Sequence, residues 1–167
     1  VVDTGIDFNC TYLKDRIIKT GFNSSGENNS ESEQDYNGHG TMVSSIIAKC
    51  TPDNVKIANY RSGTQDGKLT TTAACSAILQ AINDKVLAIN CSFIITENNI
   101  LVEEVINYAH KNNIVIFSAA GNSSANLNYM NGYPINTSSK LITVGSSDKY
   151  NLPSYFTSFG NAVDILA

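Results

Sequence analysis

Residues 86–119 decide the fold, and they read VLAINCSFIITENNILVEEVINYAHKNNIVIFSA. Segments 86–91 and 114–119 are short, almost continuous apolar runs, which are typical of strands buried in a parallel sheet. Between them, segment 98–112 carries apolar residues at helical spacing on one face. These residues are Leu101, Val105, Ile106 and Ala109. A strand, a helix and a second strand in this order predict a βαβ unit.

The same alternation continues on both sides of this unit. Further helical patterns cover 39–49 and 70–84, and further strand patterns cover 1–3, 55–60, 141–145 and 163–166. The polar, acidic stretch 23–37 is predicted to be a surface loop. We therefore expect an α/β fold with a doubly wound, mostly parallel sheet and helices on both faces, formed by residues 1–167 as a single domain.

Composition restricts the class of function. The chain has 167 residues, of which 42% are hydrophobic and 16% charged, so it can bury a substantial core. Its net charge of −4 argues against a nucleic-acid partner, because such a partner requires a basic surface. It contains no run of 18 apolar residues, so we expect no membrane-spanning segment.

The cysteine pattern gives no sign of a metal or redox site. Cys10, Cys50, Cys75 and Cys91 form no C-x-x-C pair, so we expect no metal ion and no cofactor. Cys75 and Cys91 lie in apolar stretches and are predicted to be buried thiols. The pattern leaves a disulfide open, but it favours a reducing compartment, a bacterial cytoplasm rather than the outside of the cell.

Three short polar segments carry the chemistry. Asp3 is followed by the Thr4-Gly5 turn, His39 stands in Asn-Gly-His-Gly-Thr at the start of a predicted helix, and Asn122 ends Ala-Ala-Gly-Asn. Asp3 and Asn122 both follow predicted strands. In a doubly wound sheet, ligands bind beyond the carboxyl ends of the strands, so we expect all three side chains at one edge.

These segments resemble the motifs of subtilisin-like serine peptidases. VVDTGID (residues 1–7) is similar to the family's aspartate motif, and NGHGTMVSSIIA (37–48) to its histidine motif. INCSF (89–93) resembles the substrate-binding strand, and AAGN (119–122) the oxyanion motif. SYFTSFGNAVDILA (154–167) is similar to the stretch that precedes the family's serine motif. Four motifs in the family's order are a more specific signal than any one of them.

The resemblance implies a function and a role for each residue. His39 would take a proton from a serine nucleophile, Asp3 would orient the imidazole, and Asn122 would donate its amide to the developing oxyanion. The substrate would be a peptide or protein. The residues implied to line its binding site are Leu69, Ser92, Phe93, Ile94 and Gly121.

The sequence departs from the family pattern in three ways. The Gly-Thr-Ser-Met-Ala motif of the nucleophile is absent, so we expect this chain alone to be inactive, and the native domain to extend beyond both ends of it. Phe93 and Ile94 stand where the family usually has glycines, and we expect these bulkier side chains to narrow the cleft and alter the substrate preference. The short link 49–54 and Tyr12 predict that a calcium site common in the family is missing.

Other interpretations of the same residues remain open. Asp3 alone could close a turn, His39 could be an ordinary residue of a helix N-terminus, and Asn122 could occupy a left-handed turn. The missing serine favours, as an alternative, a non-catalytic pseudo-peptidase that binds or regulates. An aspartic peptidase is a weaker alternative, because its two Asp-Thr-Gly motifs lie on an all-β frame and this chain has one such motif.

Overall fold

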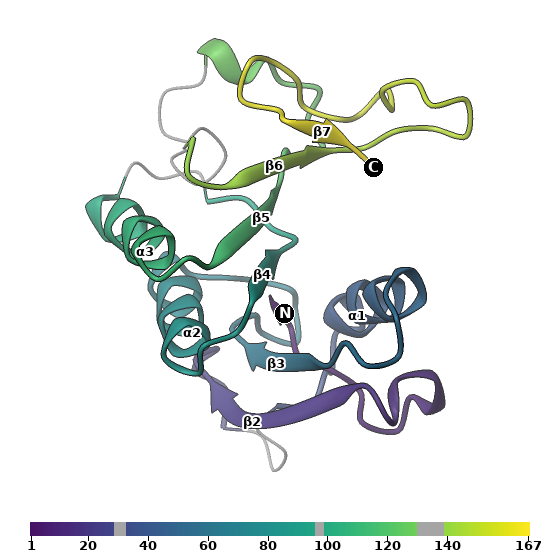
Figure 1. Cartoon of the computed structure of the whole chain (residues 1–167), viewed down its shortest axis with the longest axis vertical. Coiled ribbons are helices and arrows are strands. Elements are labelled where there is room, and N and C mark those ends of the chain that lie inside the picture. The colour runs from purple at the N-terminus through teal and green to yellow at the C-terminus, as the bar shows by residue number, and fades with distance from the viewer. Residues whose placement is uncertain (29–32, 96–98, 130–138) are drawn as a thin grey trace. The chain divides into compact units, whose positions relative to one another are not determined.

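The computed structural model describes residues 1–28, 33–95, 99–129 and 139–167 (Figure 1). The chain divides into two compact units, Val1–Val86 and Leu87–Ala167. Each unit is an α/β layer of its own, and each holds one part of the predicted chemistry.

Unit 1 is a three-stranded parallel sheet with a helix on each side. Its strands are β1 (Val2–Asp3), β2 (Ile17–Asn23) and β3 (Ile57–Arg61), in the order β2-β3-β1. Its helices are α1 (His39–Cys50) and α2 (Thr71–Asn83), with a short 3-10 turn η1 (Thr11–Leu13). Figure 1 shows α1 and α2 on opposite sides of β1 and β3. The predicted helices on both faces are thus present in this unit.

A local sequence signal fixes the start of α2. The Thr70 hydroxyl accepts a hydrogen bond from the backbone N–H of Ala73 at 3.1 Å and so caps α2. α2 then buries a stripe of small and branched residues against the sheet. The members of this stripe are Ala73, Ala74, Ala77, Ile78, Ala81 and Ile82. The stripe anchors α2 on one face and leaves the carboxyl ends of β1 and β3 free to carry polar groups.

Unit 2 is a four-stranded parallel sheet. Its strands are β4 (Ala88–Cys91), β5 (Val115–Ala119), β6 (Ile142–Gly145) and β7 (Ile165–Leu166), in this order. α3 (Ile100–Lys111) covers one side of β4 and β5 in Figure 1, and η2 (Leu127–Tyr129) follows β5. The Asn99 side chain caps α3 by accepting from the N–H of Leu101 at 2.9 Å. The βαβ unit predicted from residues 86–119 is therefore confirmed.

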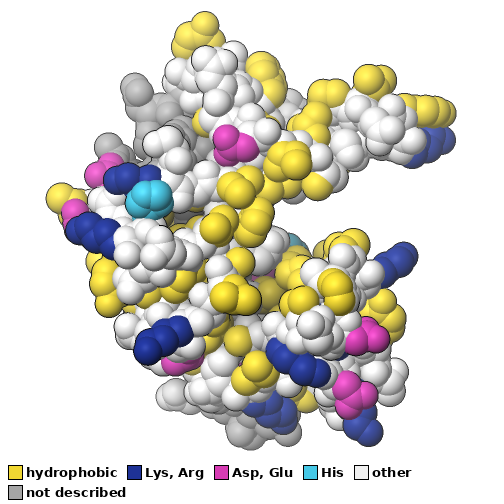
Figure 2. Space-filling view, in the orientation of Figure 1, with side chains coloured by type: hydrophobic (Ala, Val, Ile, Leu, Met, Phe, Trp, Pro, Cys, Tyr) yellow, Lys and Arg dark blue, Asp and Glu magenta, His cyan; other side chains and the backbone are white. Residues whose placement is uncertain are grey.

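The two faces of the unit 2 sheet differ in how far their side chains are buried. Ile89 and Ile116, which are neighbours in the register, are buried on the face that packs under α3. On the other face, Val115 is 41% exposed and Phe117 is 37% exposed. Figure 2 shows hydrophobic side chains gathered over this part of the sheet. The prediction of two fully buried strands was wrong in this respect, since burial alternates along β5 with the pleat.

Two further expectations need correction in detail. The predicted strand 86–91 begins at Ala88, and Leu87 is exposed rather than buried. The predicted surface loop 23–37 overlaps the end of β2 at Asn23, and the carboxylates of Glu33 and Asp35 are buried. Both are acidic residues in a polar stretch, and they are buried because backbone and hydroxyl donors surround them. Residues 29–32 of that stretch lie outside the described residues, as does Asn98 of the predicted helix 98–112.

Candidate functional site

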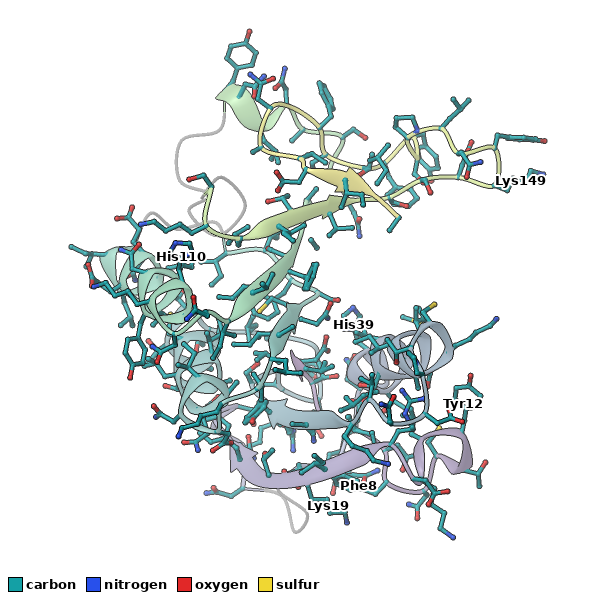
Figure 3. The ribbon with its side chains drawn as sticks, viewed as in Figure 1. Phe8, Tyr12, Lys19, His39, His110 and Lys149 are labelled. Atoms are coloured by element: carbon teal, nitrogen blue, oxygen red, sulfur yellow. The ribbon has the colours of Figure 1, made fainter. Side chains whose placement is uncertain are left out.

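The buried carboxylate of Asp3 and the half-exposed imidazole of His39 form a pair in unit 1. Asp3 is the last residue of β1 and is 4% exposed, while His39 is the first residue of α1. Nδ1 of His39 lies 2.7 Å from Oδ1 of Asp3, the length of a charge-assisted hydrogen bond. Figure 3 shows His39 at the start of α1. The contact that the sequence predicted between these two side chains is present.

Backbone donors hold Asp3 in place from several directions. The N–H of Thr4 donates to Oδ1 of Asp3 at 2.7 Å, and the N–H groups of Ser62 and Gly63 donate to its carbonyl oxygen at 2.8 and 3.0 Å. Oδ2 of Asp3 is buried and has no hydrogen-bond partner among the described residues. These hydrogen bonds fix the position of the Asp3 carboxylate, so its contact with the imidazole keeps one geometry.

Glycines let the helix of His39 approach the turn after β1 closely. A Cβ added at Gly40 would lie 2.2 Å from the carbonyl oxygen of Gly5 and 3.1 Å from Cβ of Asp3. Gly38, the residue before the helix, has a left-handed φ of 101°. Only glycine at position 40 leaves room for the hydrogen bond between His39 of α1 and Asp3 of β1.

The pair has a defined chemical capacity. A carboxylate at Nδ1 keeps the proton on that nitrogen and leaves the lone pair of Nε2 free to accept another proton. The His39 side chain is 42% exposed, so solvent or a ligand can reach the ring. The arrangement is that of a general base oriented by an anionic partner.

Asn122 lies in the turn that follows β5 in unit 2. Gly121 has a left-handed φ of 98°, and its carbonyl oxygen accepts from the N–H of Ser158 at 2.9 Å. The N–H of Ala120 donates to the carbonyl oxygen of Val144 at 2.8 Å. The Asn122 side chain is exposed, and within the described part of unit 2 no hydrogen bond fixes its amide. The turn is rigid while the amide at its tip is free to turn toward a ligand.

Two of the predicted substrate-binding segments meet in unit 2. A Cβ added at Gly121 would lie 3.5 Å from Cγ2 of Ile94, so Gly121 and Ile94 are in contact range. The Ser92 hydroxyl accepts from the side-chain amide of Asn90 at 2.9 Å. Ser92 and Phe93 are half-buried beyond the end of β4, and Leu69 is half-buried in unit 1.

Cysteines, a second histidine and further acidic residues lie outside the Asp3–His39 pair. In the described ranges, no cluster of three or more His, Cys, Asp or Glu residues could hold a metal ion. All four cysteines are free thiols, and burial raises the pKa of the Cys75 thiol to about 11. Among the helices of the described residues, none is long and apolar enough to cross a membrane. His110 lies exposed near the end of α3 (Figure 3).

Sequence reasoning missed Asp35, a buried carboxylate beside the pair. It lies four residues before His39, in the stretch interpreted as a surface loop. Burial alone would raise the pKa of Asp35, but hydrogen bonds from Thr41, Gly38 and Thr4 outweigh it and hold the pKa below its usual value. An acidic residue two positions before an Asn-Gly turn often accepts hydrogen bonds from the backbone of that turn, and this pattern could have predicted the position of Asp35.

The parallel α/β layers and the carboxylate–imidazole pair match the class of subtilisin-like serine peptidases. The sequence profile described as "Subtilase family" matches residues 1–167. The chain belongs to the subtilase family.

Individual relatives agree with this assignment. The chain is 28% identical over 176 residues to "Thermophilic serine proteinase" of Bacillus sp. (strain AK1), an alignment that covers 100% of this chain and 42% of that protein. It is 30% identical over 176 residues to "Thermitase" of Thermoactinomyces vulgaris, covering 100% of this chain and 61% of that one. The chain thus spans roughly half of the length of the relatives it matches.

Solved structures show the same fold. A crystal structure of a lanthipeptide protease superposes with a TM-score of 0.87 at 26% identity, over 99% of this chain and 53% of that one. The crystal structure of a cold adapted subtilisin-like serine proteinase gives a TM-score of 0.82 at 25% identity, over 99% of this chain and 60% of the other. The predicted α/β subtilisin-like fold is confirmed.

Proposed function

We propose that this chain is the base-bearing part of a serine endopeptidase domain, in which residues 1–167 belong to a single domain and the nucleophilic serine lies outside them. The observation that carries the proposal is the 2.7 Å contact between Asp3 and His39 at the carboxyl end of β1. The subtilase membership supports it, because this pair is what a serine nucleophile needs for activation. On this proposal the chain alone does not cleave peptides.

The proposed chemistry proceeds through an acyl-enzyme. Nε2 of His39 accepts the serine proton as the serine oxygen attacks the scissile carbonyl carbon, and Asp3 stabilises the imidazolium that forms. The imidazolium then gives this proton to the leaving amine as the peptide C–N bond breaks. His39 then takes a proton from a water molecule that attacks the acyl carbon, and gives this proton to the serine oxygen as the ester C–O bond breaks. Acylation and deacylation each end with a neutral imidazole.

Asn122 is proposed as the side-chain donor to the oxyanion. Its exposed amide lies at the tip of a turn that backbone hydrogen bonds hold rigid. A preorganised donor of this type stabilises the negative charge that develops on the carbonyl oxygen. The substrate is proposed to be a peptide or protein that contacts Leu69, Ser92, Phe93, Ile94 and Gly121. The partner needed for activity is the remaining part of the same domain.

The test uses a protein that carries the complete domain proposed here. A fluorophosphonate probe should label one serine of that protein, because the probe reacts with a serine that a histidine base activates. The His39→Ala variant is the matched control and should lose the labelling while its thermal unfolding stays close to that of the native protein. Equal labelling of both proteins, or none of either, would contradict the proposal.

One observation favours a second candidate, a non-catalytic module of the same fold. Ile94 packs against Gly121, and bulky Phe93 and Ile94 stand beyond the end of β4 where the family usually has glycine. Side chains there narrow the space beside the Asn122 turn. A complete domain that binds peptides but is not labelled by the probe would support this second candidate.

A further inference from the structure

We propose that Asp35 is a positioning residue for the reaction: its buried carboxylate fastens the first turn of α1 to the turn after β1, and so keeps the His39 imidazole on Asp3. The kinetic part of this proposal rests on the peptidase function proposed above. Its geometric part concerns unit 1 alone.

The carboxylate of Asp35 accepts hydrogen bonds from the turn that follows Asp3 and from the start of the helix that carries His39. Oδ1 accepts from the Thr4 hydroxyl at 2.9 Å and from the N–H groups of Asn37 and Gly38 at 3.0 and 2.8 Å. Oδ2 accepts from the N–H and the hydroxyl of Thr41 at 2.9 and 2.6 Å. Asp35 is 8% exposed, so these bonds form largely out of water, where an unpaired donor is costly.

Thr4 is the bridge between Asp35 and the pair. Its hydroxyl donates to Asp35 and accepts from the N–H of Gly40 at 3.0 Å. Thr4 directly follows Asp3, and Gly40 directly follows His39. The residues next to Asp3 and His39 are therefore joined through one hydroxyl group, and Asp35 fixes the orientation of this hydroxyl by accepting its hydrogen bond.

The charge of Asp35 suits this place. Three backbone N–H groups at the start of α1 point to its two oxygens, where the helix dipole favours a negative charge. Its depressed pKa agrees with a carboxylate that stays ionised while donors surround it. An asparagine in its place would direct an NH₂ group at other donors and leave at least one of them unpaired.

A second buried carboxylate provides a matched comparison. Glu33 is 5% exposed and lies two residues before Asp35. Its Oε1 accepts hydrogen bonds from the N–H and the hydroxyl of Thr20 at 2.6 and 2.9 Å, so this carboxylate contacts β2 and not the start of α1. Glu33→Gln therefore removes a buried charge from the same segment without touching the link between Thr4, Asp35 and Gly40. Comparing Glu33→Gln with Asp35→Asn therefore distinguishes a loss of activity caused by lower stability from one caused by displacement of the His39 imidazole.

The experiment compares Asp35→Asn with Glu33→Gln in the complete domain proposed above. We expect Asp35→Asn to lower kcat by about 10²-fold while KM changes less than about twofold, because a small displacement of a reacting group costs rate rather than binding. Glu33→Gln should retain kcat. In proton NMR, the low-field signal of the His39 Nδ1–H proton should vanish or broaden in Asp35→Asn and persist in Glu33→Gln.

Additional variants keep the proposal testable if Asp35→Asn does not fold. Thr4→Val removes the bridging hydroxyl at nearly constant volume and should lower kcat and abolish the low-field signal, as Asp35→Asn does. Thr4→Ser keeps a hydroxyl and should retain both kcat and the low-field signal. If the native protein is inactive, the proposed function fails, and the NMR comparison alone decides on the positioning role. A low-field signal that survives in both Asp35→Asn and Thr4→Val would overturn the proposal.

Discussion

The turn after β1 and the turn after β5 occupy equivalent places, each at the carboxyl end of a parallel strand in its own unit, but they are built differently. The first turn is buried and is tied by side-chain hydrogen bonds that link residues more than thirty positions apart, such as Thr4 and Asp35. The second turn is held by backbone hydrogen bonds, and its tip residue Asn122 is exposed.

The difference follows from the charge that each turn carries. A carboxylate facing an imidazole must keep one geometry through a proton transfer, so its surroundings have to be rigid before the reaction begins. A neutral amide can be solvated until a ligand arrives, and it needs only a fixed backbone below it. Substitutions in the two turns should therefore differ in their effects, and kinetic effects are those expected in the complete domain proposed above.

The largest effect is expected at Asp3. Asp3→Asn should lower kcat by about 10⁴-fold, because an amide favours the wrong tautomer of His39 and cannot stabilise the imidazolium. Steady-state kinetics on a peptide substrate measures the change, and unchanged far-ultraviolet circular dichroism serves as the control for folding. A loss of less than tenfold would mean that the pair does not orient the base.

Asn122→Ala should have a smaller effect of a distinct kind. We expect kcat to fall by about 10²–10³-fold with KM nearly constant, because the amide acts only on the developing oxyanion. The melting temperature should stay within experimental error, since the exposed side chain is bound to no other described residue of unit 2. A large drop in stability with normal kcat would instead favour the structural role of Asn122 as a turn residue.

Gly40→Ala and Gly121→Ala contrast the packing of the two turns. A methyl group at Gly40 meets the carbonyl oxygen of Gly5 at 2.2 Å, so it should cost about 1–3 kcal/mol in the free energy of unfolding and weaken the bond between His39 and Asp3. At Gly121 the left-handed backbone is the main obstacle, with a cost of about 1–2 kcal/mol. Chemical denaturation gives both values, and the low-field NMR signal should weaken in Gly40→Ala alone.

The smallest effect concerns pH. The pKa of Asp35 is depressed in the folded protein, so its contribution to stability is complete above the unfolded value of about 4 and declines as the pH falls through the folded value. Denaturation at several pH values should show stability falling more steeply below about pH 4 in the native protein than in Asp35→Asn. Parallel curves for the two proteins would show that Asp35 does not supply the linkage.

Much of this molecule could be predicted from its sequence, and the failures have physical reasons. Continuous apolar runs and helical stripes located most of the strands and helices, and the polar segments after the predicted strands located Asp3 and Asn122. β2 was missed because Lys19, Thr20 and Gly21 interrupt its apolar pattern. Asp35 was missed because burial of an acidic residue depends on donors that only the folded chain brings together, among them Thr4, which lies 31 positions away.

The uncovered face of β5 has a practical consequence for work with this chain. Val115 and Phe117 meet water on a sheet of the parallel type, which proteins normally shield on both sides. Apolar contact with such a surface lowers the free energy of the system, so the isolated chain should bind hydrophobic dyes and should aggregate in concentrated solution. Low protein concentration and a mild detergent are the conditions in which its folded units should be handled.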